Sequence, residues 1–427
     1  MAYSHLGLRT SRCVFCSAFL VFLIAALCPG VESQTYSVLH TFCSQADCAD
    51  GAYPYSGVMM DSEGNLYGTT ALGGLPDLCT IAYSVGCGVV FKLDMAGNET
   101  ALYAFSAPDG DNPEAGLIRD ANNNLYGMTL YGGNENRPCN TGGCGVVFRV
   151  TPGGAESVLY AFKGEEDGAF PSGSLLFDTA GNLYGTTQNA SNHGPREAGV
   201  VFRLAANGEE TVLHTFPAYK GDGRDPNGFL LLDAQGNLYG TTVWGGHEGL
   251  LSSGNHCEKG CGTIYKINAS GEESVVYRFK GYKRQDGAAP SLSFIDSHNN
   301  LYGETGWGGR YGYGTIFALT PSGSEKLLYA FTNRNDGSYP NGQLVQDEQG
   351  NLYGTTLEGG AYGYGTIFEL TASGTLHVIF NFPGGTGGEY PYGLFRDTEG
   401  NLYGTAGGGV ANPNCYAGCG IVFKLTP

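Results

Sequence analysis

The chain has 427 residues, a length usually divided among two or three domains, and it contains 71 glycines, 28 tyrosines and only 15% charged residues. Its 41% hydrophobic share is too high for a disordered chain, and its net charge of −18 disfavours binding to nucleic acid or to anionic membranes. This composition suits a folded all-β protein made of short strands and tight turns.

The first 33 residues are arranged like a secretory signal peptide. Two arginines precede the uncharged stretch CVFCSAFLVFLIAAL (residues 13–27), and Val31 and Ser33 provide the small residues of a cleavage site. The apolar stretch is too short to span a bilayer comfortably. We predict removal of residues 1–33, a mature chain of residues 34–427 with no membrane span, and a secreted, periplasmic or cell-surface location.

The strand expected at residues 36–42 (YSVLHTF) is followed by seven copies of the phrase DxxGNLYGTT or a close variant. The copies begin 50 to 63 residues apart, which is typical of propeller blades with inserted loops. Their aspartates are Asp61, Asp120, Asp178, Asp233, Asp296, Asp347 and Asp397. We therefore predict seven units, each with four strands that we call A, B, C and D.

The third unit illustrates the expected strands. We predict strand A over Ser174–Phe177, strand B over Leu183–Thr187 and strand C over Val200–Leu204, with the preceding strand D over Ser157–Phe162. The DxxGN phrase joins strands A and B as a tight hairpin, because Asp caps its own turn and Gly or Asn tolerates a positive φ. A calcium site needs several converging oxygen ligands, whereas each turn offers one carboxylate, so we predict turn caps.

The two ends of the repeat array complement each other. The last unit supplies strands over residues 393–396, 402–405 and 421–425 and lacks strand D, whereas residues 36–42 match ESVLYAF (156–162) and ETVLHTF (210–216). We predict that residues 36–42 pair with the C-terminal blade and close a seven-bladed β-propeller of four-stranded blades. Closure removes exposed sheet edges, and a linear solenoid would not need this split.

The motifs GNLYGTT, GG, GxV/IFxL and ExVLYxF recur in a fixed order along the chain. In this respect the sequence resembles the GloVer tandem repeat of the choice-of-anchor exported bacterial proteins, and the resemblance covers essentially the whole mature chain. It implies an extracytoplasmic repeat protein. It brings no activity, substrate or catalytic residue with it.

Ten cysteines follow the leader and fall into five close pairs, which are Cys43 with Cys48, Cys79 with Cys87, Cys139 with Cys144, Cys257 with Cys261, and Cys415 with Cys419. Because exported proteins favour disulfides, we predict a bond within each pair. Zinc would also suit this spacing, but we expect the pairs to lie in different blades, too far apart to share an ion. We predict no metal and no cofactor.

The two faces of the expected ring differ in their loops. The A–B and C–D turns are short and uniform, whereas the B–C loops vary widely in length, so we place a ligand site on the face with the B–C and D–A loops, or at the channel mouth there. The candidate ligand-binding aromatics are Trp244, Trp307, Tyr131, Tyr311 and Tyr362. Those of the D–A segments recur by position, so we expect them to pack between blades; they are Tyr53, Phe170, Tyr339 and Tyr390.

Catalytic signals are sparse. His247 and His256 share the fourth B–C loop with Glu248 and Glu258, but no motif links them to a nucleophile or metal. The histidines of the D strands are expected to be structural, and the acidic loop after residue 108 is expected to be solvated; these residues are His40, His214 and His377, and Asp109, Asp111 and Glu114.

The sequence therefore favours a monomeric, noncatalytic binding protein whose ligand is a carbohydrate or an extracellular protein. Two alternatives stay open. One is a hydrolase or lyase that acts on an extracellular polymer through the fourth B–C loop, and the other is a structural component of the cell envelope.

Overall fold

The computed structural model describes residues 34–75, 79, 85–133, 139, 142–164, 166–189, 197–217, 221–246, 257, 260–281, 285–411, 413–415 and 418–427. The chain divides into two units, Met1–Ser33 and Gln34–Pro427, and the described residues belong to the second. The predicted leader lies outside them. In the part that is described, no helix is long and apolar enough to cross a bilayer.

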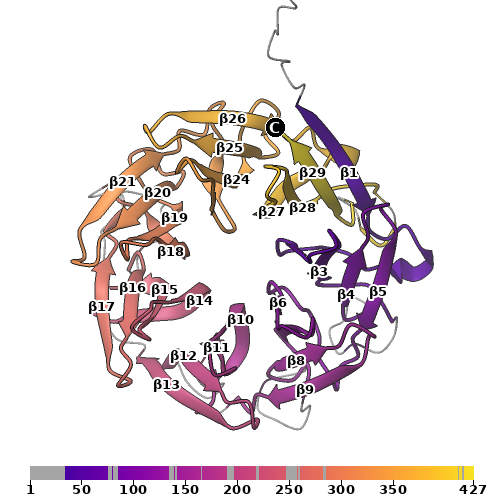
Figure 1. Ribbon diagram of the computed structural model, residues 1–427, viewed down its shortest axis with the longest axis horizontal. Coiled ribbons are helices and arrows are strands. Elements are labelled where there is room, and N and C mark those ends of the chain that lie inside the picture. Colours follow the sequence, from indigo (N-terminus) through magenta and orange to yellow (C-terminus); the bar gives the residue numbers. More distant parts are fainter. Residues whose placement is uncertain are drawn as a thin grey trace, which may run out of the picture. The chain divides into compact units, whose positions relative to one another are not determined.

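The unit Gln34–Pro427 is all-β, with groups of antiparallel strands arranged around a central axis (Figure 1). The first three groups are β2 (Met59–Met60), β3 (Leu66–Thr70), β4 (Val89–Leu93) and β5 (Glu99–Ala104); β6 (Ile118–Arg119), β7 (Leu125–Thr129), β8 (Val146–Val150) and β9 (Glu156–Ala161); and β10 (Ala169–Phe177), β11 (Leu183–Asn189), β12 (Glu197–Leu204) and β13 (Glu210–Pro217).

The chain continues around the axis in the same pattern. The next groups are β14 (Gly223–Leu232), β15 (Leu238–Gly245), β16 (Thr263–Ile267) and β17 (Glu273–Arg278); β18 (Ala288–Ile295), β19 (Leu301–Trp307), β20 (Thr315–Leu319) and β21 (Glu325–Ala330); and β22 (Ser338–Pro340) with β23 (Val345–Gln346), β24 (Leu352–Glu358), β25 (Thr366–Leu370) and β26 (Leu376–Asn381). A parallel bridge between Ser174 and Phe229 joins β10 to β14, so these two groups form one eight-stranded sheet.

The last sheet combines the two ends of the unit. It contains β27 (Glu389–Arg396), β28 (Leu402–Gly407), β29 (Ile421–Thr426) and β1 (Thr35–Thr41), with β1 antiparallel to β29 (Figure 1). Two short 3-10 turns complete the described elements, η1 (Ala46–Cys48) and η3 (Gly385–Gly387). The segment that the sequence assigned to closure therefore lies along β29, within one residue of its expected bounds.

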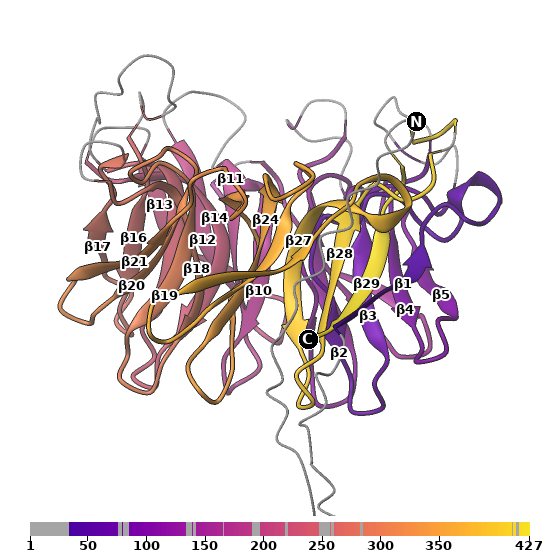
Figure 2. The same ribbon diagram turned by 90° about the horizontal axis from the view of Figure 1, so that it is seen from above.

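Strand boundaries differ from the sequence-based expectation mainly on the inner strands. The inner strand of the third group begins at Ala169 rather than Ser174, because Ala169 already pairs with Asn189 and Ser172 with Thr186. The register then shifts between Ser172 and Leu176, which is a bulge. Viewed from the side, the strands run between two opposite faces of the unit (Figure 2).

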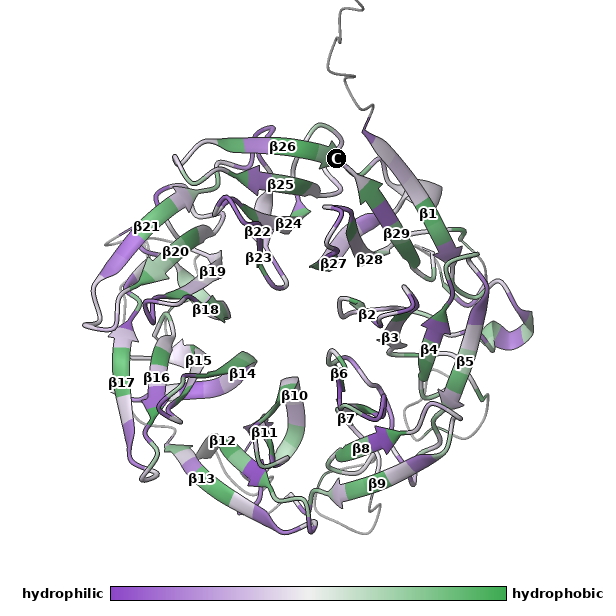
Figure 3. Cartoon of the chain, in the orientation of Figure 1, coloured by the Kyte–Doolittle hydropathy of each residue, from purple (hydrophilic) through white to green (hydrophobic). Residues whose placement is uncertain are grey.

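The core lies between neighbouring groups. Each third strand carries one buried ring that meets, edge to face, the buried phenylalanine after the outer strand of the preceding group, with centroids 4.9–5.3 Å apart. The third-strand rings are Phe91, Phe148, Phe202, Tyr265, Phe317, Phe368 and Phe423. Figure 3 shows hydrophobic stretches along β8, β12 and β29, whose buried residues belong to the hydrophobic clusters of this core.

A glycine–proline contact also recurs between neighbouring groups. A Cβ atom at Gly145 would lie 2.4 Å from Cδ of Pro171, so this close approach requires glycine. The residue before the proline, Phe170, has a φ of 59° and donates its N–H to the carbonyl of Cys144 at 2.9 Å. At three of the four positions the ring meets a tyrosine of the preceding group edge to face, at 5.5–6.4 Å, so these side chains lie between groups as predicted; they are Phe170, Tyr339 and Tyr390.

The repeated aspartates cap their own hairpins. Oδ1 of Asp61 accepts hydrogen bonds from the backbone N–H groups of Glu63 and Asn65, and Oδ2 accepts from the Asn65 amide and the Tyr67 hydroxyl. Partial burial raises the pKa of Asp61, but these hydrogen bonds outweigh it and hold the pKa below its usual value. The backbone and Asn contacts recur at Asp120, Asp178, Asp233, Asp296, Asp347 and Asp397.

Candidate functional site

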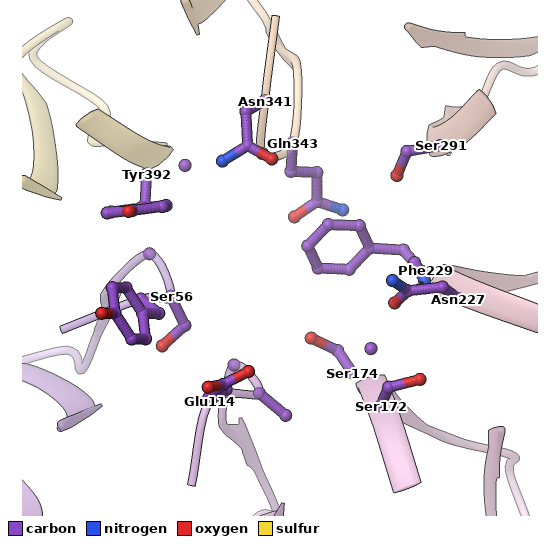
Figure 4. Close-up of a pocket in the computed structure, with 18 of the residues that line it drawn as sticks. Ser56, Glu114, Ser172, Ser174, Asn227, Phe229, Ser291, Asn341, Gln343 and Tyr392 are labelled. Atoms are coloured by element: carbon purple, nitrogen blue, oxygen red, sulfur yellow. Dashed lines mark hydrogen bonds between the residues drawn. The ribbon is translucent and has the colours of Figure 1, made fainter. Parts of the chain in front are cut away.

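The innermost strands surround a cavity of about 990 Å³ (Figure 4). Its described lining combines hydroxyl and amide side chains with aromatic rings, and it contains two carboxyl groups and no Lys, Arg or His. The polar residues include Ser56, Ser172, Ser174, Asn227, Ser291, Asn341 and Gln343, the rings include Tyr55, Phe229, Trp307 and Tyr392, and the carboxyl groups are Glu114 and Glu304. Such a mixture is typical of small-molecule sites.

Glu304 is the most unusual of the lining residues. It replaces the threonine that five other repeats carry in the phrase GNLYGTT, and its side chain is 2% exposed. Its Oε1 atom is buried and has no hydrogen-bond partner. Burial raises the pKa of Glu304 well above its ordinary value, because the low-dielectric surroundings disfavour the charged form. A carboxyl group held in this way is a common sign of a functional site.

The threonines at the same position in other repeats show what Glu304 lacks. The hydroxyl of Thr241 donates to the carbonyl of Asn227 at 2.8 Å, and that of Thr355 donates to the carbonyl of Asn341 at 2.7 Å. These bonds tie the second strand to the inner strand of its own group. Glu304 was not predicted as a site residue, although the break in the repeat phrase was a visible signal.

The second carboxyl group lies on another side of the cavity, near Tyr392 and Ser56 (Figure 4). Glu114 is exposed to solvent within the cavity. Partial desolvation by the surrounding protein raises its pKa, and a hydrogen bond to Asn112 lowers the pKa by a smaller amount. Tyr55 and Tyr392 meet edge to face at 5.4 Å, and burial raises the pKa of both phenols, with the charge of Glu114 contributing.

The expectation of a solvated acidic loop around Glu114 was wrong for its neighbours. Asp111 is 1% exposed. Asp109 accepts hydrogen bonds from the hydroxyl of Tyr103 at 2.6 Å and from the backbone N–H of Ser106 at 2.7 Å. Asp111 is buried and Asp109 is hydrogen-bonded, whereas Glu114 is exposed, so a local count of charges did not predict their surroundings.

The only two tryptophans of the chain lie side by side. Trp244 is the penultimate residue of β15 and Trp307 is the last residue of β19, and their ring centroids are 5.8 Å apart with an interplanar angle of 32°. Both are half-buried, and Trp307 lines the cavity. They come from neighbouring groups and from strand ends that lead into the B–C loops. The structure therefore brings these two predicted site residues together, with Trp307 at the cavity.

The other predicted aromatics lie elsewhere. Tyr131 packs edge to face against Phe170 at 5.5 Å and does not line the cavity. Tyr311 and Tyr362 are 48% and 63% exposed. The guanidinium of Arg310 lies 5.5 Å from the Tyr311 ring centre, a cation–π distance. These three tyrosines are therefore separate from the tryptophan pair and from the cavity lining.

The structure joins the ten cysteines in the five predicted pairs. One expectation about their placement was wrong. The sulfur of Cys43 lies within 4.8 Å of those of Cys415 and Cys419, so two pairs far apart in the sequence are neighbours. The pairing of β1 with β29 brings the first pair onto the same sheet as the last, which explains the contact.

Two D-strand histidines hydrogen-bond or lie against an aspartate. Nε2 of His40 is 3.2 Å from Asp50, and Nε2 of His214 is 3.4 Å from Asp222. The loop residues that supported the catalytic alternative, namely His247, His256, Glu248 and Glu258, lie outside the described residues. The described residues therefore include the cavity with Trp307 and Glu304, but not the loop on which the catalytic alternative depended.

Two solved structures are similar to the chain. The extracellular domain of BT4673 from B. thetaiotaomicron is 11% identical with a TM-score of 0.53, and the match covers 91% of this chain and 39% of that one. A gluconolactonase from Xanthomonas campestris is 16% identical with a TM-score of 0.43, covering 84% of this chain and 96% of that one. The likeness to the BT4673 domain, at 11% identity, concerns only the fold, which is all-β and β-propeller-like. No curated protein matches the chain.

The family comparison agrees with the motif order described above. The model of the Gloeobacter/Verrucomicrobia repeat matches residues 27–252 and again residues 249–427. The two matches together span the whole unit Gln34–Pro427. The chain therefore belongs to the Gloeobacter/Verrucomicrobia repeat family.

Proposed function

We propose that residues 34–427 form a closed seven-bladed β-propeller whose last blade is completed by β1. Support comes from contacts between the first and last groups that repeat those found elsewhere. A Cβ atom at Gly420 would lie 2.2 Å from Cδ of Pro54, and the N–H of Tyr53 donates to the carbonyl of Cys419 at 2.7 Å. These are the counterparts of the Gly145–Pro171 and Phe170–Cys144 contacts.

We further propose that residues 1–33 direct export and are removed. When the full chain is produced in a bacterium with an intact secretion pathway, the exported protein is expected to begin at Gln34, because Val31 and Ser33 form the cleavage motif. The intact mass of the purified protein checks this. Recovery of a chain that keeps Met1 in the cell pellet would contradict the proposal.

The function we propose is noncatalytic binding of a neutral, hydroxyl-rich ligand, such as a carbohydrate, in the central cavity. The observation that carries this is the Trp244–Trp307 pair beside a cavity lined by hydroxyl and amide groups. A sugar presents apolar C–H faces that suit an aromatic ring and hydroxyl groups that suit Ser, Asn and Gln side chains. An extracellular protein that inserts a polar side chain is the related possibility.

Charge narrows the ligand class. The described lining has no cationic side chain, and the whole chain carries a net charge of −18, so anionic ligands are disfavoured. The two carboxyl groups have raised pKa values, which favours their neutral forms more than usual. A protonated carboxyl group donates one hydrogen bond and accepts others, as hydroxyl-rich ligands require.

The first test is retention of the mature chain by neutral polysaccharides such as β-glucan, xylan and chitin, with anionic pectin for comparison. We expect retention by a neutral polymer without release of soluble fragments. Trp307→Ala is expected to weaken binding about tenfold to hundredfold, because a central aromatic anchor contributes roughly 1.4–2.8 kcal/mol.

Tyr362→Ala is the matched control, because Tyr362 is exposed and does not line the cavity. Its binding is expected to equal that of the wild type. If Tyr362→Ala weakened binding more than Trp307→Ala, the site would lie on the loop face instead. Retention by no polysaccharide would favour a protein partner or a structural role in the envelope.

The raised pKa values of Glu304 and Glu114 favour one second candidate, a hydrolase or lyase of an extracellular polymer. A carboxyl group whose pKa is raised above its ordinary value can serve as a general acid. Release of soluble fragments in the retention assay would support it. Glu304→Gln would then be expected to abolish release while leaving retention intact.

A further inference from the structure

A three-residue arrangement recurs where the outer strands of neighbouring groups meet. Near the end of four outer strands, a tyrosine hydroxyl donates to an aspartate that follows the strand, as in Tyr103 with Asp109 at 2.6 Å and Tyr160 with Asp167 at 2.8 Å. A glutamate at the start of the next outer strand lies close by. Burial, followed by the charge of Asp109, raises the pKa of Glu156 to about 7.

At the junction between β13 and β17 the tyrosine is replaced by His214. Its Nε2 lies 3.4 Å from Oδ2 of Asp222 but makes no hydrogen bond, and Oε1 of the nearby Glu273 is buried without a hydrogen-bond partner. One ligand atom each from His214, Asp222 and Glu273 lies within 4.8 Å of the other two. Burying polar atoms without hydrogen-bond partners lowers the stability of the folded chain, unless a bound ligand bridges them.

The surroundings of the three residues leave them able to take a ligand together. The His214 ring rests edge to face on Phe216 at 4.6 Å, which orients the imidazole. Burial and the charge of Asp222 raise the pKa of Glu273, and the nearby Arg278 lowers it by a smaller amount. The guanidinium of Arg278 donates instead to the carbonyl of Gly221, at 3.0 and 3.1 Å. Side chains of His214 and Asp222 are each 21% exposed, so solvent reaches them.

The only comparable junction shows why the arrangement is distinctive. His40 and Asp50 occupy the same positions, but Asp50 is already saturated by the backbone N–H and hydroxyl of Ser44 and the backbone N–H of Gln45. Among the described residues, His214, Asp222 and Glu273 form the one metal-type cluster without cysteine. Nε2 of His214 makes no hydrogen bond, whereas Nε2 of His40 is bonded to Asp50, and this is the difference between the two junctions.

We propose that His214, Asp222 and Glu273 bind a divalent cation of the zinc class. One imidazole and two carboxylates form a common three-residue ligand set, with water in the fourth position, and the imidazole disfavours Ca²⁺ and Mg²⁺, which prefer all-oxygen sites. The ion would neutralise two acidic groups and link β13 to β17. It lies on the outer strands, so it is independent of the ligand proposed for the central cavity.

The test uses the mature chain dialysed against EDTA and titrated with Zn²⁺ by calorimetry, with a parallel thermal unfolding series. We expect one equivalent of Zn²⁺ to bind and the unfolding midpoint to rise with Zn²⁺ concentration, because an ion bound only to the folded chain stabilises it. Ca²⁺ at the same concentration is expected to leave the midpoint unchanged. Binding should weaken as pH falls, because the ligands must be deprotonated.

His214→Tyr is the decisive variant, because four equivalent positions carry tyrosine and the variant is expected to fold. It should lose Zn²⁺ affinity at least tenfold. Glu273→Gln should lose Zn²⁺ affinity to the same extent, and it replaces His214→Tyr as the test if that variant does not fold. His40→Tyr is the matched control and should bind like the wild type. Absence of stoichiometric Zn²⁺ binding to the wild type, or equal binding by the folded His214→Tyr variant, would overturn the proposal.

Discussion

Deleting residues 34–42 from the mature chain is expected to abolish cooperative folding and to cause aggregation. The deletion removes β1, which exposes the edge of β29 from Ile421 to Thr426. It also removes Phe42, which is 1% exposed, and Tyr36, whose ring stacks on Phe380 at 4.0 Å. Loss of one buried phenylalanine alone costs about 3–5 kcal/mol, a large part of a typical stability of roughly 5–15 kcal/mol.

Size-exclusion chromatography and urea unfolding measure this effect. The matched pair of point variants is Phe42→Ala and Phe331→Ala, because both phenylalanines follow an outer strand and pack edge to face on a third-strand ring. In a closed ring both are expected to lose about 3–5 kcal/mol. A much smaller loss for Phe42→Ala, together with a soluble, monomeric deletion variant, would show that β1 does not close the ring.

Glu304→Thr is expected to stabilise the protein, and the gain is expected to grow as pH rises. Threonine is the usual residue of the repeat at this position and donates to an inner-strand carbonyl in other groups, whereas Oε1 of Glu304 has no partner. Removing an unpartnered buried polar group contributes about 1–3 kcal/mol. Urea unfolding of both proteins between pH 4.5 and pH 8.5 measures the difference.

The pH dependence follows from the raised pKa of Glu304. The folded chain holds this proton more tightly than the unfolded chain, so the stability linked to it is present below the ordinary value of 4.5 and is lost as pH rises towards the folded-state pKa. The threonine variant lacks that loss. Other glutamates with raised pKa values are common to both proteins and cancel in the difference.

Glu304→Gln provides the control for this prediction. It keeps a polar side chain of the same size but cannot titrate. At low pH its free energy of unfolding should therefore nearly equal that of the wild type. As pH rises it should become more stable than the wild type, because only the wild type loses stability by ionisation of Glu304. A stability gap that narrowed as pH rose would show that the cavity stabilises the ionised carboxylate of Glu304.

The repeat, its strands and its hairpins were predictable from the sequence because they depend on local interactions. Asp61 is bonded to residues that lie two, four and six positions further along the chain, so the phrase DxxGNLY contains its own turn. The cysteine pairs are likewise close in sequence. The alternation of short apolar strands and glycine-rich turns determined an all-β repeat protein, and the split between the two ends predicted that β1 would pair with β29.

The sites depended on the tertiary structure. Trp244 and Trp307 come from different groups, as do His214 and Glu273, whereas Cys43 and Cys415 meet where the two ends of the chain share one sheet. The members of each pair are separated by tens or hundreds of residues. Their proximity is set by how the twisted groups pack around the axis, and no local pattern encodes that arrangement. The burial of Glu304 has the same origin, because only the assembled inner strands exclude water from its carboxyl group.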